Sequence, residues 1–383
     1  MQSHGVRVVW RADAHDRARQ EHIGRHLKRF RPEVRLAVGA LAARHARLAD
    51  LVVSFPALCV ALAKPRARFD PRPATADVVA GARLAELART AGVPLWLRGL
   101  PPESFAGRLP VLPDSESFGR SIANHLPLSP KHAAMWLEAV SLAANLGHED
   151  LAVWFAREFL RDVKRITSID HARIRLLSLW AWYSGQPGTR AHTLIDRPWN
   201  PDMRMKTATT AADNWQASVD VVASLGDRPV ANMWFKPACV DGYEFVPLAT
   251  AADIIDEGRV MKNCVRTYGA NVAHDYCRLW SVRKEGKRVA TLRISHYDRE
   301  PVPNVAEAEL ASNRRAPKEI WCAAHKWISE QDLMNFEGRD LKWGTVPLDT
   351  GVWRQLWKPY WLAKKRIPAW LPVTPTRGAV DAL

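Results

Sequence analysis

The residue types that could carry out a reaction are concentrated between Glu257 and Tyr268. Cys264 precedes Tyr268 by four positions, which places the thiol and the phenol one helical turn apart. A thiol becomes nucleophilic when a cation or a helix N-terminus lowers its pKa, and a carboxylate such as Glu257 can orient a base. The catalytic hypothesis is a pocket formed by five side chains, namely Glu257, Cys264, Tyr268, Arg283 and Asn313.

A structural interpretation of the same segment competes with this hypothesis. Apolar and aromatic residues recur there at helical spacing and predict one helix over 261–272 with a buried stripe. The members of this stripe are Met261, Cys264, Val265, Tyr268 and Val272. The preceding helix, over 251–257, is predicted to end at Gly258. Free cysteine is among the most buried residue types, so Cys264 would then belong to the core.

A third interpretation of the cysteines is a zinc site, which needs four nitrogen or sulfur ligands. The candidate ligands are His274 with Cys277, Cys322 with His325, and Cys264 as a spare. No C-x-x-C pair occurs, and the five cysteines are scattered along the chain, so we expect no metal, no cofactor and no disulfide framework. The sequence also lacks the motifs of P-loop proteins, dinucleotide-binding proteins, serine hydrolases and zinc proteases.

Positive charge is the main signal about partners. The formal net charge is +15 and the pI is about 9.9, and such a charge attracts polyanions over long distances. Phosphate contacts are predicted in a basic helix over 15–30, after Asn313, and in a basic, aromatic tail over 341–383. They are Arg17, Arg25, Lys28, Arg29, Arg314, Arg315, Lys364, Lys365 and Arg366. A solvated turn is the alternative for the pair that follows Asn313.

The tail is rich in tryptophan as well as in lysine and arginine. Its tryptophans are Trp343, Trp353, Trp357, Trp361 and Trp370. Large rings could stack on bases, but we expect them to pack onto the protein and leave the cations in solvent. Pro359 is expected to interrupt the helix that the spacing of these rings predicts.

Hydrophobic periodicity predicts an α+β protein with a mainly helical N-terminal half, followed by a small antiparallel sheet with packed helices. Strands are expected at 233–235, 243–248, 277–283, 288–295 and 304–311, and a helix at 316–333. The expected organisation is a helical region over 1–200, an α+β domain over 201–340 and the tail over 341–383. No secretory signal and no apolar stretch of about 20 residues is visible, so we expect a cytoplasmic protein without a membrane partner.

Several motifs over about 234–330 resemble the PcfJ-like family of bacterial plasmids, prophages and conjugative elements. The motifs are Glu257-Gly258, then Cys264-Val265 with Tyr268, then Ser281 with Arg283, then Thr291-Leu292, and finally a polar strand from Glu307 or Glu309 to Asn313. The resemblance rests on the order and spacing of these motifs. It implies an association with mobile elements and conjugative transfer, and it implies no known reaction.

The sequence therefore predicts a nucleic-acid-associated accessory protein of a plasmid, phage or conjugative element. Two other hypotheses stay open. One is a hydrolase-type enzyme, acting on nucleic acid or protein, with a pocket around Cys264. The other is an adaptor that binds protein partners in a transfer or defence complex. Whether the protein is an enzyme is left open by the sequence.

Overall fold

The computed structural model describes residues 14–127, 129–161, 170–296, 302–332 and 349–367. Its contacts divide the chain into two compact units, Met1–Trp182 with Asn200–Met205 and Tyr183–Trp199 with Lys206–Leu383. Trp343 and Trp370 of the predicted tail lie outside the described residues. None of the described helices is both long enough and apolar enough to cross a membrane.

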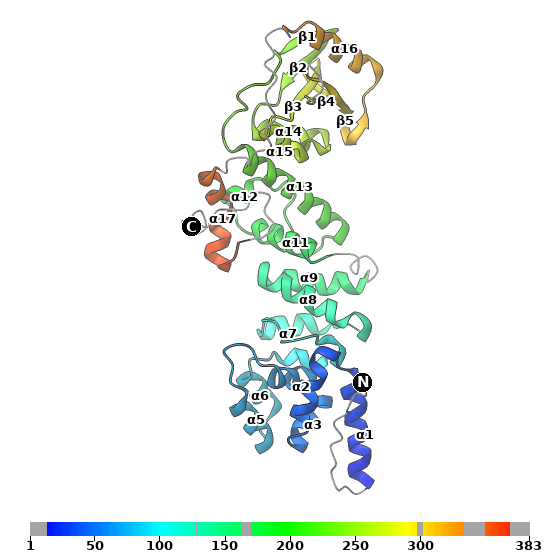
Figure 1. Cartoon of the computed structure of the whole chain (residues 1–383), viewed down its shortest axis with the longest axis vertical. Helices are drawn as coiled ribbons and strands as arrows, with labels where there is room; N and C mark the ends of the chain where they lie inside the picture. The colour runs from blue at the N-terminus through cyan, green and yellow to red at the C-terminus, as the bar shows by residue number, and fades with distance from the viewer. Residues whose placement is uncertain (1–13, 128, 162–169, 297–301, 333–348, 368–383) are drawn as a thin grey trace, which may run out of the picture. The chain divides into compact units, whose positions relative to one another are not determined.

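The first unit is helical throughout its described secondary structure (Figure 1). Its elements are α1 (Ala14–Arg29), α2 (Pro32–Ala42), α3 (Ala46–Ser54), α4 (Pro56–Ala63), α5 (Pro71–Ala80), α6 (Leu84–Thr90), the 3₁₀ helices η1 (Leu95–Gly99) and η2 (Pro102–Ser104), α7 (Glu116–Ala123), α8 (Pro130–Leu146), α9 (Glu149–Arg161) and most of α11 (His171–Ser184). Proline begins α2, α4, α5 and α8, because its fixed φ suits the first turn and its missing N–H has no partner there.

Aromatic rings fill the core of the first unit, and Trp154 is 1% exposed. Its Nε1 donates a hydrogen bond to the carbonyl of Met203 over 2.8 Å. The carboxylate of Glu158 accepts the backbone N–H of Met205 over 3.0 Å. These two bonds explain why the segment 200–205 belongs to the first unit although the chain before it belongs to the second.

In the second unit, α12 (Arg190–Thr193), α13 (Met205–Leu225) and α17 (Thr350–Lys364) surround Tyr183. The ring of Tyr183 lies against those of Trp215, Trp357 and Tyr360. Its hydroxyl donates to the carbonyl of Leu356 over 2.5 Å. Buried rings therefore attach α17 to the rest of this unit.

This packing confirms the expectation for two tryptophans of the tail, Trp353 and Trp357, which are each 1% exposed, whereas Trp361 is half-buried. The prediction that Pro359 interrupts the helix is wrong, because α17 continues through it to Lys364.

The second unit also contains a six-stranded antiparallel sheet whose strands lie in chain order (Figure 1). The strands are β1 (Ala238–Val240), β2 (Tyr243–Pro247), β3 (Cys277–Lys284), β4 (Lys287–Ser295), β5 (Asn304–Leu310) and β6 (Arg314–Arg315). Between β2 and β3 lie α14 (Ala251–Met261), the 3₁₀ helix η3 (Cys264–Tyr268) and α15 (Gly269–Ala273); η4 (Ala311–Asn313) joins β5 to β6, and α16 (Lys318–Ser329) follows β6. The predicted α+β fold is confirmed.

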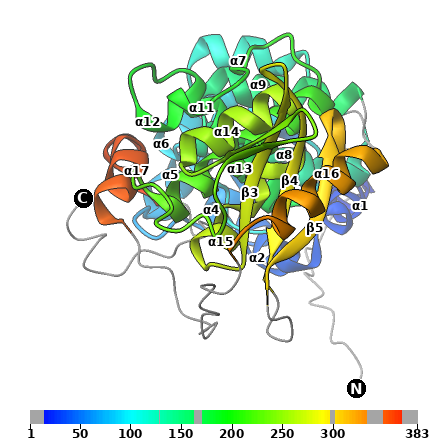
Figure 2. The ribbon, with the colours of Figure 1, turned by 90° about the horizontal axis from the view of Figure 1, so that it is seen from above.

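The two faces of the sheet differ because side chains alternate along each strand. One face is apolar and packs against α16, with Trp280 and Trp327 fully buried. The other face lies beneath α14, on the opposite side of β3 and β4 from α16 (Figure 2). There Ser281, Thr291 and Glu309 are direct neighbours in register on β3, β4 and β5. This second face is called the polar face below.

Two local predictions were wrong. The expected helix over 261–272 is broken, because α14 continues past Gly258 to Met261 and Lys262 then adopts a left-handed conformation with φ of 50°. The segment 233–235 is irregular rather than a strand, and Trp234 has φ of 67°. Positive φ is uncommon for residues with a Cβ, so both positions are held by surrounding contacts.

Candidate functional site

Helix α14 positions Glu257, the first motif residue, over the polar face. Its start is fixed by a capping box, in which Thr250 accepts the N–H of Asp253 and the carboxylate of Asp253 accepts the N–H of Thr250. Two turns later Glu257 is fully buried. The nearest cation is Arg288, whose Nε lies 3.0 Å from Glu257 Oε2.

Glu257 begins a chain of buried hydrogen bonds. The hydroxyl of Thr291 donates to Glu257 Oε1 over 2.8 Å and accepts from Asn263 Nδ2, also over 2.8 Å. Burial raises the pKa of Glu257, while the hydrogen bond from Thr291, the nearby hydroxyl of Ser281 and the charges of Arg288 and Arg283 act in the opposite direction. The carboxyl is thus held by neighbours on β3 and β4 and is closed to solvent.

The side-chain oxygen of Asn263 caps the start of η3. Its Oδ1 accepts the N–H of Val265 over 3.3 Å, as an N-cap residue does. Because its amide nitrogen is bonded to Thr291, the side chain ties the start of η3 to the sheet. The left-handed turn at Lys262 is therefore fixed on both sides, by the end of α14 and by Asn263.

Cys264 connects η3 to the far end of the polar face. Its backbone N–H donates to Asn313 Oδ1 over 2.9 Å, and its thiol lies 3.8 Å from Glu309 Oε2. The pKa of the thiol is raised, first by burial and then by the negative charges of Glu309 and Glu307. A neutral thiol is a poor nucleophile, so this environment does not favour the catalytic role considered for Cys264.

Tyr268 is held by an ionic group on the same face. Its hydroxyl donates to Glu307 Oε2 over 2.7 Å, and Arg293 donates to Glu307 Oε1 over 2.8 Å. The guanidinium of Arg293 also lies 5.0 Å from the centre of the Tyr268 ring. Burial alone would raise the pKa of Glu307, but the hydrogen bonds from Arg293 and Tyr268 outweigh it and lower that pKa. Burial and Glu307 raise the pKa of Tyr268.

Close approaches explain the motif glycine Gly258 and one further glycine, Gly269. A Cβ on Gly258 would lie 2.8 Å from Arg266 Cγ, so only glycine lets this arginine cross α14. Arg266 then donates to Asp196 over 2.8 Å and to Ser218 over 2.9 Å. A Cβ on the glycine that begins α15, Gly269, would lie 2.8 Å from the backbone of α13.

Four exposed residues lie where η3 meets the connection between β5 and β6. They are Lys262, Asn313, Arg314 and Arg315, and the three cations among them are called the cationic border below. The hydrogen bond from Cys264 to Asn313 brings the two chain segments together. Among the described residues, no carboxylate forms an ion pair with Lys262, Arg314 or Arg315.

The structure thus places Glu257, Cys264, Tyr268 and Asn313 on one face of the sheet, and the charge of Arg283 acts on Glu257. The residues predicted to contact phosphate are separated into three places. Arg25, Lys28 and Arg29 lie on α1, Arg314 and Arg315 on β6, and Lys364, Lys365 and Arg366 at the end of α17. Arg17 also lies on α1, but its side chain is outside the described residues.

Paired carboxylates distinguish some of these cations from others. Arg29 forms a 2.8 Å ion pair with Glu103, so its charge is partly neutralised. The pKa of Lys364 is lowered by burial and by the charge of Arg366. Within the described residues, the cations of the cationic border have no paired carboxylate.

Three residues of the polar face had no role in the sequence-based hypotheses. Asn263 and Arg293 carried no motif signal, and Thr291 entered only as part of the Thr291-Leu292 motif, without a role in the site. The polar residue at an inward-facing position of β4 was the available signal for Thr291. Within the described ranges, no group of three or more His, Cys, Asp or Glu residues is arranged to hold a metal ion. Cys277 is buried, whereas Cys322 and His325 are exposed.

Residues 232–316 match the family model described as PcfJ-like protein. This segment is a PcfJ-like domain. The PcfJ-like domain spans all six strands together with α14, η3 and α15, and it contains every motif residue of the polar face. The resemblance drawn from the motifs is therefore confirmed. No curated protein and no solved structure matches the chain.

Proposed function

We propose that this protein binds nucleic acid through the cationic border of its PcfJ-like domain, as an accessory protein of a plasmid, phage or conjugative element. The observation that carries the proposal is the hydrogen bond from the Cys264 N–H to Asn313 Oδ1. It joins two segments that are far apart in the chain, and the exposed cations beside it, Lys262, Arg314 and Arg315, have no carboxylate partner in the described part of the structure.

The chemistry of the border suits phosphate. Arginine presents a planar fork of donors that matches phosphate oxygens, and lysine adds a compact positive charge. Arg314 Nε already donates to the carbonyl of Ala311 over 3.2 Å, which limits the orientations of its guanidinium and leaves its other donors available. A net charge of +15 adds long-range attraction for a polyanion.

The motif residues then have a positioning role. Left-handed backbone at Lys262, Ser312 and Asn313 carries a conformational cost, which the surrounding contacts must offset. The buried bonds of Glu257, Thr291 and Asn263 hold one of the two segments in place. This explains why buried polar residues occur beside an exposed basic surface.

The test is a salt titration of binding to a labelled oligonucleotide. The triple variant Lys262→Gln, Arg314→Gln, Arg315→Gln is compared with the wild type by fluorescence anisotropy between low and moderate NaCl concentrations. Loss of three phosphate contacts reduces the slope of log K against log salt by about 2–3, because each contact releases roughly 0.7–0.9 counterions. Single-stranded and duplex DNA and RNA serve as parallel probes.

The matched control removes the same charge elsewhere. The variant Arg44→Gln, Arg83→Gln, Arg89→Gln changes three exposed arginines of the first unit that have no ion pair among the described residues. It is expected to keep the wild-type slope. Equal slopes for the two triple variants, or no binding by the wild type at low salt, would overturn the proposal.

A further inference from the structure

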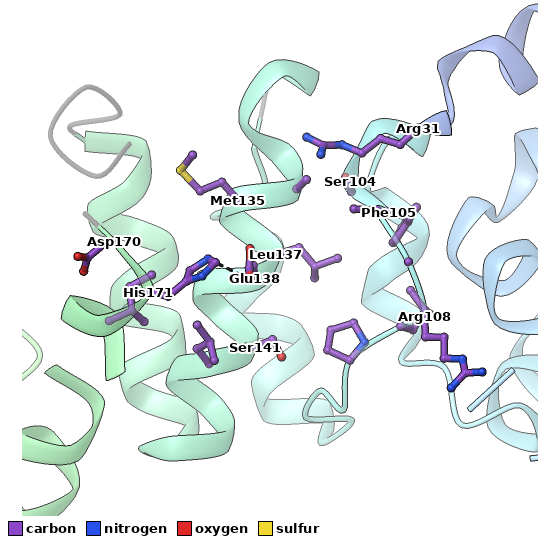
Figure 3. Close-up of a pocket in the computed structure, with 17 residues that line it drawn as sticks. Arg31, Ser104, Phe105, Arg108, Met135, Leu137, Glu138, Ser141, Asp170 and His171 are labelled. Carbon is purple, nitrogen blue, oxygen red and sulfur yellow. Dashed lines mark ion pairs between the residues drawn. The ribbon is translucent and has the colours of Figure 1, made fainter. Parts of the chain in front are cut away.

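The first unit contains an open cavity of about 810 Å³ between η2, the loop that follows it, α8 and the start of α11 (Figure 3). Its wall is largely apolar, and several of the apolar residues that form it are buried. They include Phe105, Leu109, Leu137 and Ile174. Cavities of this size, with an apolar wall and a few polar groups, are the usual form of a small-molecule site.

Charge is unevenly distributed around the cavity. Arg31 and Arg108 extend from one side, and both are exposed (Figure 3). No carboxylate among the described residues forms an ion pair with either guanidinium. On the other side, His171 Nε2 lies 3.0 Å from Glu138 Oε1, and Asp170 is adjacent. One side therefore attracts an anion and the other repels it.

A buried hydroxyl lies beside Arg31 (Figure 3). Ser104 lines the cavity and is 2% exposed, and its Oγ has no hydrogen-bond partner among the described residues. Most buried polar groups in proteins are hydrogen-bonded, so an unpaired one at the wall of a cavity is a ready donor for a ligand. The neighbouring hydroxyl of Ser141 differs, because it is bonded to Asn145 over 3.3 Å.

We propose that this cavity binds a small amphipathic anion, with its apolar body against α8 and its negative group toward Arg31 and Ser104. Arg108 adds positive charge on the same side of the cavity. The class comprises aliphatic or aromatic molecules that carry one carboxylate, sulfate or phosphate. Burial of the body supplies affinity, and the guanidinium of Arg31 selects the charge of the ligand. Nothing in this inference depends on the cationic border, which belongs to the other unit.

The experiment is isothermal titration of the full chain with decanoate, decyl phosphate and decanol, each below its micellar or solubility limit. The wild type is expected to bind both anions more tightly than the neutral alcohol. The variant Arg31→Gln, Arg108→Gln is expected to lower the affinity for both anions by roughly tenfold or more, because hydrogen bonds between charged groups are the strong ones. Its affinity for decanol is expected to stay within about twofold of the wild-type value. The ratio of decanoate to decyl phosphate distinguishes a carboxylate from a phosphate headgroup.

Two further variants separate the site from general effects. Ala134→Leu reduces the cavity volume and is expected to weaken all three ligands, with folding checked by circular dichroism and thermal melting. Arg44→Gln with Arg89→Gln removes the same charge outside the cavity and is expected to change nothing. The proposal is overturned if the anions do not bind saturably. It is overturned as well if Arg31→Gln, Arg108→Gln lowers the affinity for decanol as much as the affinity for decanoate. It is also overturned if Ala134→Leu binds like the wild type.

Discussion

Gly258 is a glycine because the side chain of Arg266 passes directly over it. An alanine methyl there would lie 2.8 Å from Cγ and 2.9 Å from Nε of Arg266, which is anchored at Asp196 and Ser218 and cannot move away freely. We expect Gly258→Ala to lower the free energy of unfolding by about 1–3 kcal/mol, as overpacked cores do. Urea denaturation followed by tryptophan fluorescence measures the change.

The control for this substitution is Gly39→Ala. Gly39 lies inside α2, and a Cβ there has open space around it. Replacing a helical glycine by alanine without a clash is expected to stabilise the protein by about 0.5–1 kcal/mol. A similar effect of both substitutions would show that Arg266 does not impose glycine at position 258.

The buried carboxyl of Asp220 on α13 is expected to make the stability of the folded protein depend on pH. Burial raises its pKa to about 7, and its Oδ1 has no hydrogen-bond partner among the described residues. The folded protein therefore keeps this carboxyl protonated at pH values where the unfolded chain ionises it. As a result, Asp220 lowers stability as pH rises from about 4 to about 7, and the loss then stays constant.

The substitution Asp220→Asn removes this penalty. We expect wild type and variant to melt alike near pH 4 and the variant to be more stable above pH 7, by up to about 4 kcal/mol from the size of the pKa shift. Melting temperatures of both proteins between pH 4 and 8 provide the measurement. A difference that does not vary with pH would contradict the assignment.

At the scale of elements, the connection between η3 and η4 depends on one side chain. Asn313 has φ of 57°, a left-handed conformation that asparagine tolerates better than most residues, and its Oδ1 accepts the Cys264 N–H. Asn313→Gly keeps the backbone conformation and removes only the acceptor. We expect amide hydrogen exchange at Cys264 to accelerate by about fivefold, for the loss of one hydrogen bond of roughly 1 kcal/mol.

The amide of Val265 is the internal reference for that measurement, because it donates to Asn263 rather than to Asn313. Its exchange is expected to stay close to the wild-type rate. Uniform acceleration of both amides would indicate a general loss of stability. No acceleration at Cys264 would show that Asn313 does not hold the two elements together.

The elements of the sheet were predictable from local pattern, and the network on its polar face was not. Alternation and a hairpin loop predicted strands at 277–283, 288–295 and 304–311, close to the observed β3, β4 and β5. The prediction of a helix over 261–272 was wrong because tertiary contacts override the helical periodicity of the sequence. The side chain of Asn263 caps a new start, and Asn313, 49 residues away, takes the Cys264 N–H.

The same distinction applies to the candidate site. Glu257, Cys264 and Tyr268 were recognised as a group because they are close in sequence. Their partners Thr291, Glu307 and Glu309 come from strands whose register is set by long-range pairing. Residue types therefore suggested a reactive thiol, whereas the strand register places two carboxylates beside it and keeps it protonated.

At the scale of the whole molecule, the second unit requires the segment 183–199. This segment supplies Tyr183 to the aromatic cluster, the Ala191 carbonyl that accepts Trp215 Nε1 over 2.8 Å, and Asp196 as the partner of Arg266. We expect a fragment of residues 183–383 to unfold cooperatively and a fragment of residues 206–383 to lack a cooperative transition. Thermal melting followed by near-ultraviolet circular dichroism compares them.

A matched experiment adds a synthetic peptide of residues 183–199 to the shorter fragment. Recovery of the near-ultraviolet signal is expected, because the missing side chains are then supplied in trans. A shorter fragment that melts as cooperatively as the longer one would show that this segment is dispensable.

The hydrogen bond between Tyr183 and the Leu356 carbonyl spans 173 residues. At ribosomal rates of roughly 5–20 residues per second, α17 is synthesised about 10–30 s after Tyr183. The apolar core of the sheet, whose last member is Ile328, is complete earlier. During that interval the nascent chain presents a half-covered aromatic surface, which makes it a client for chaperones that bind exposed rings.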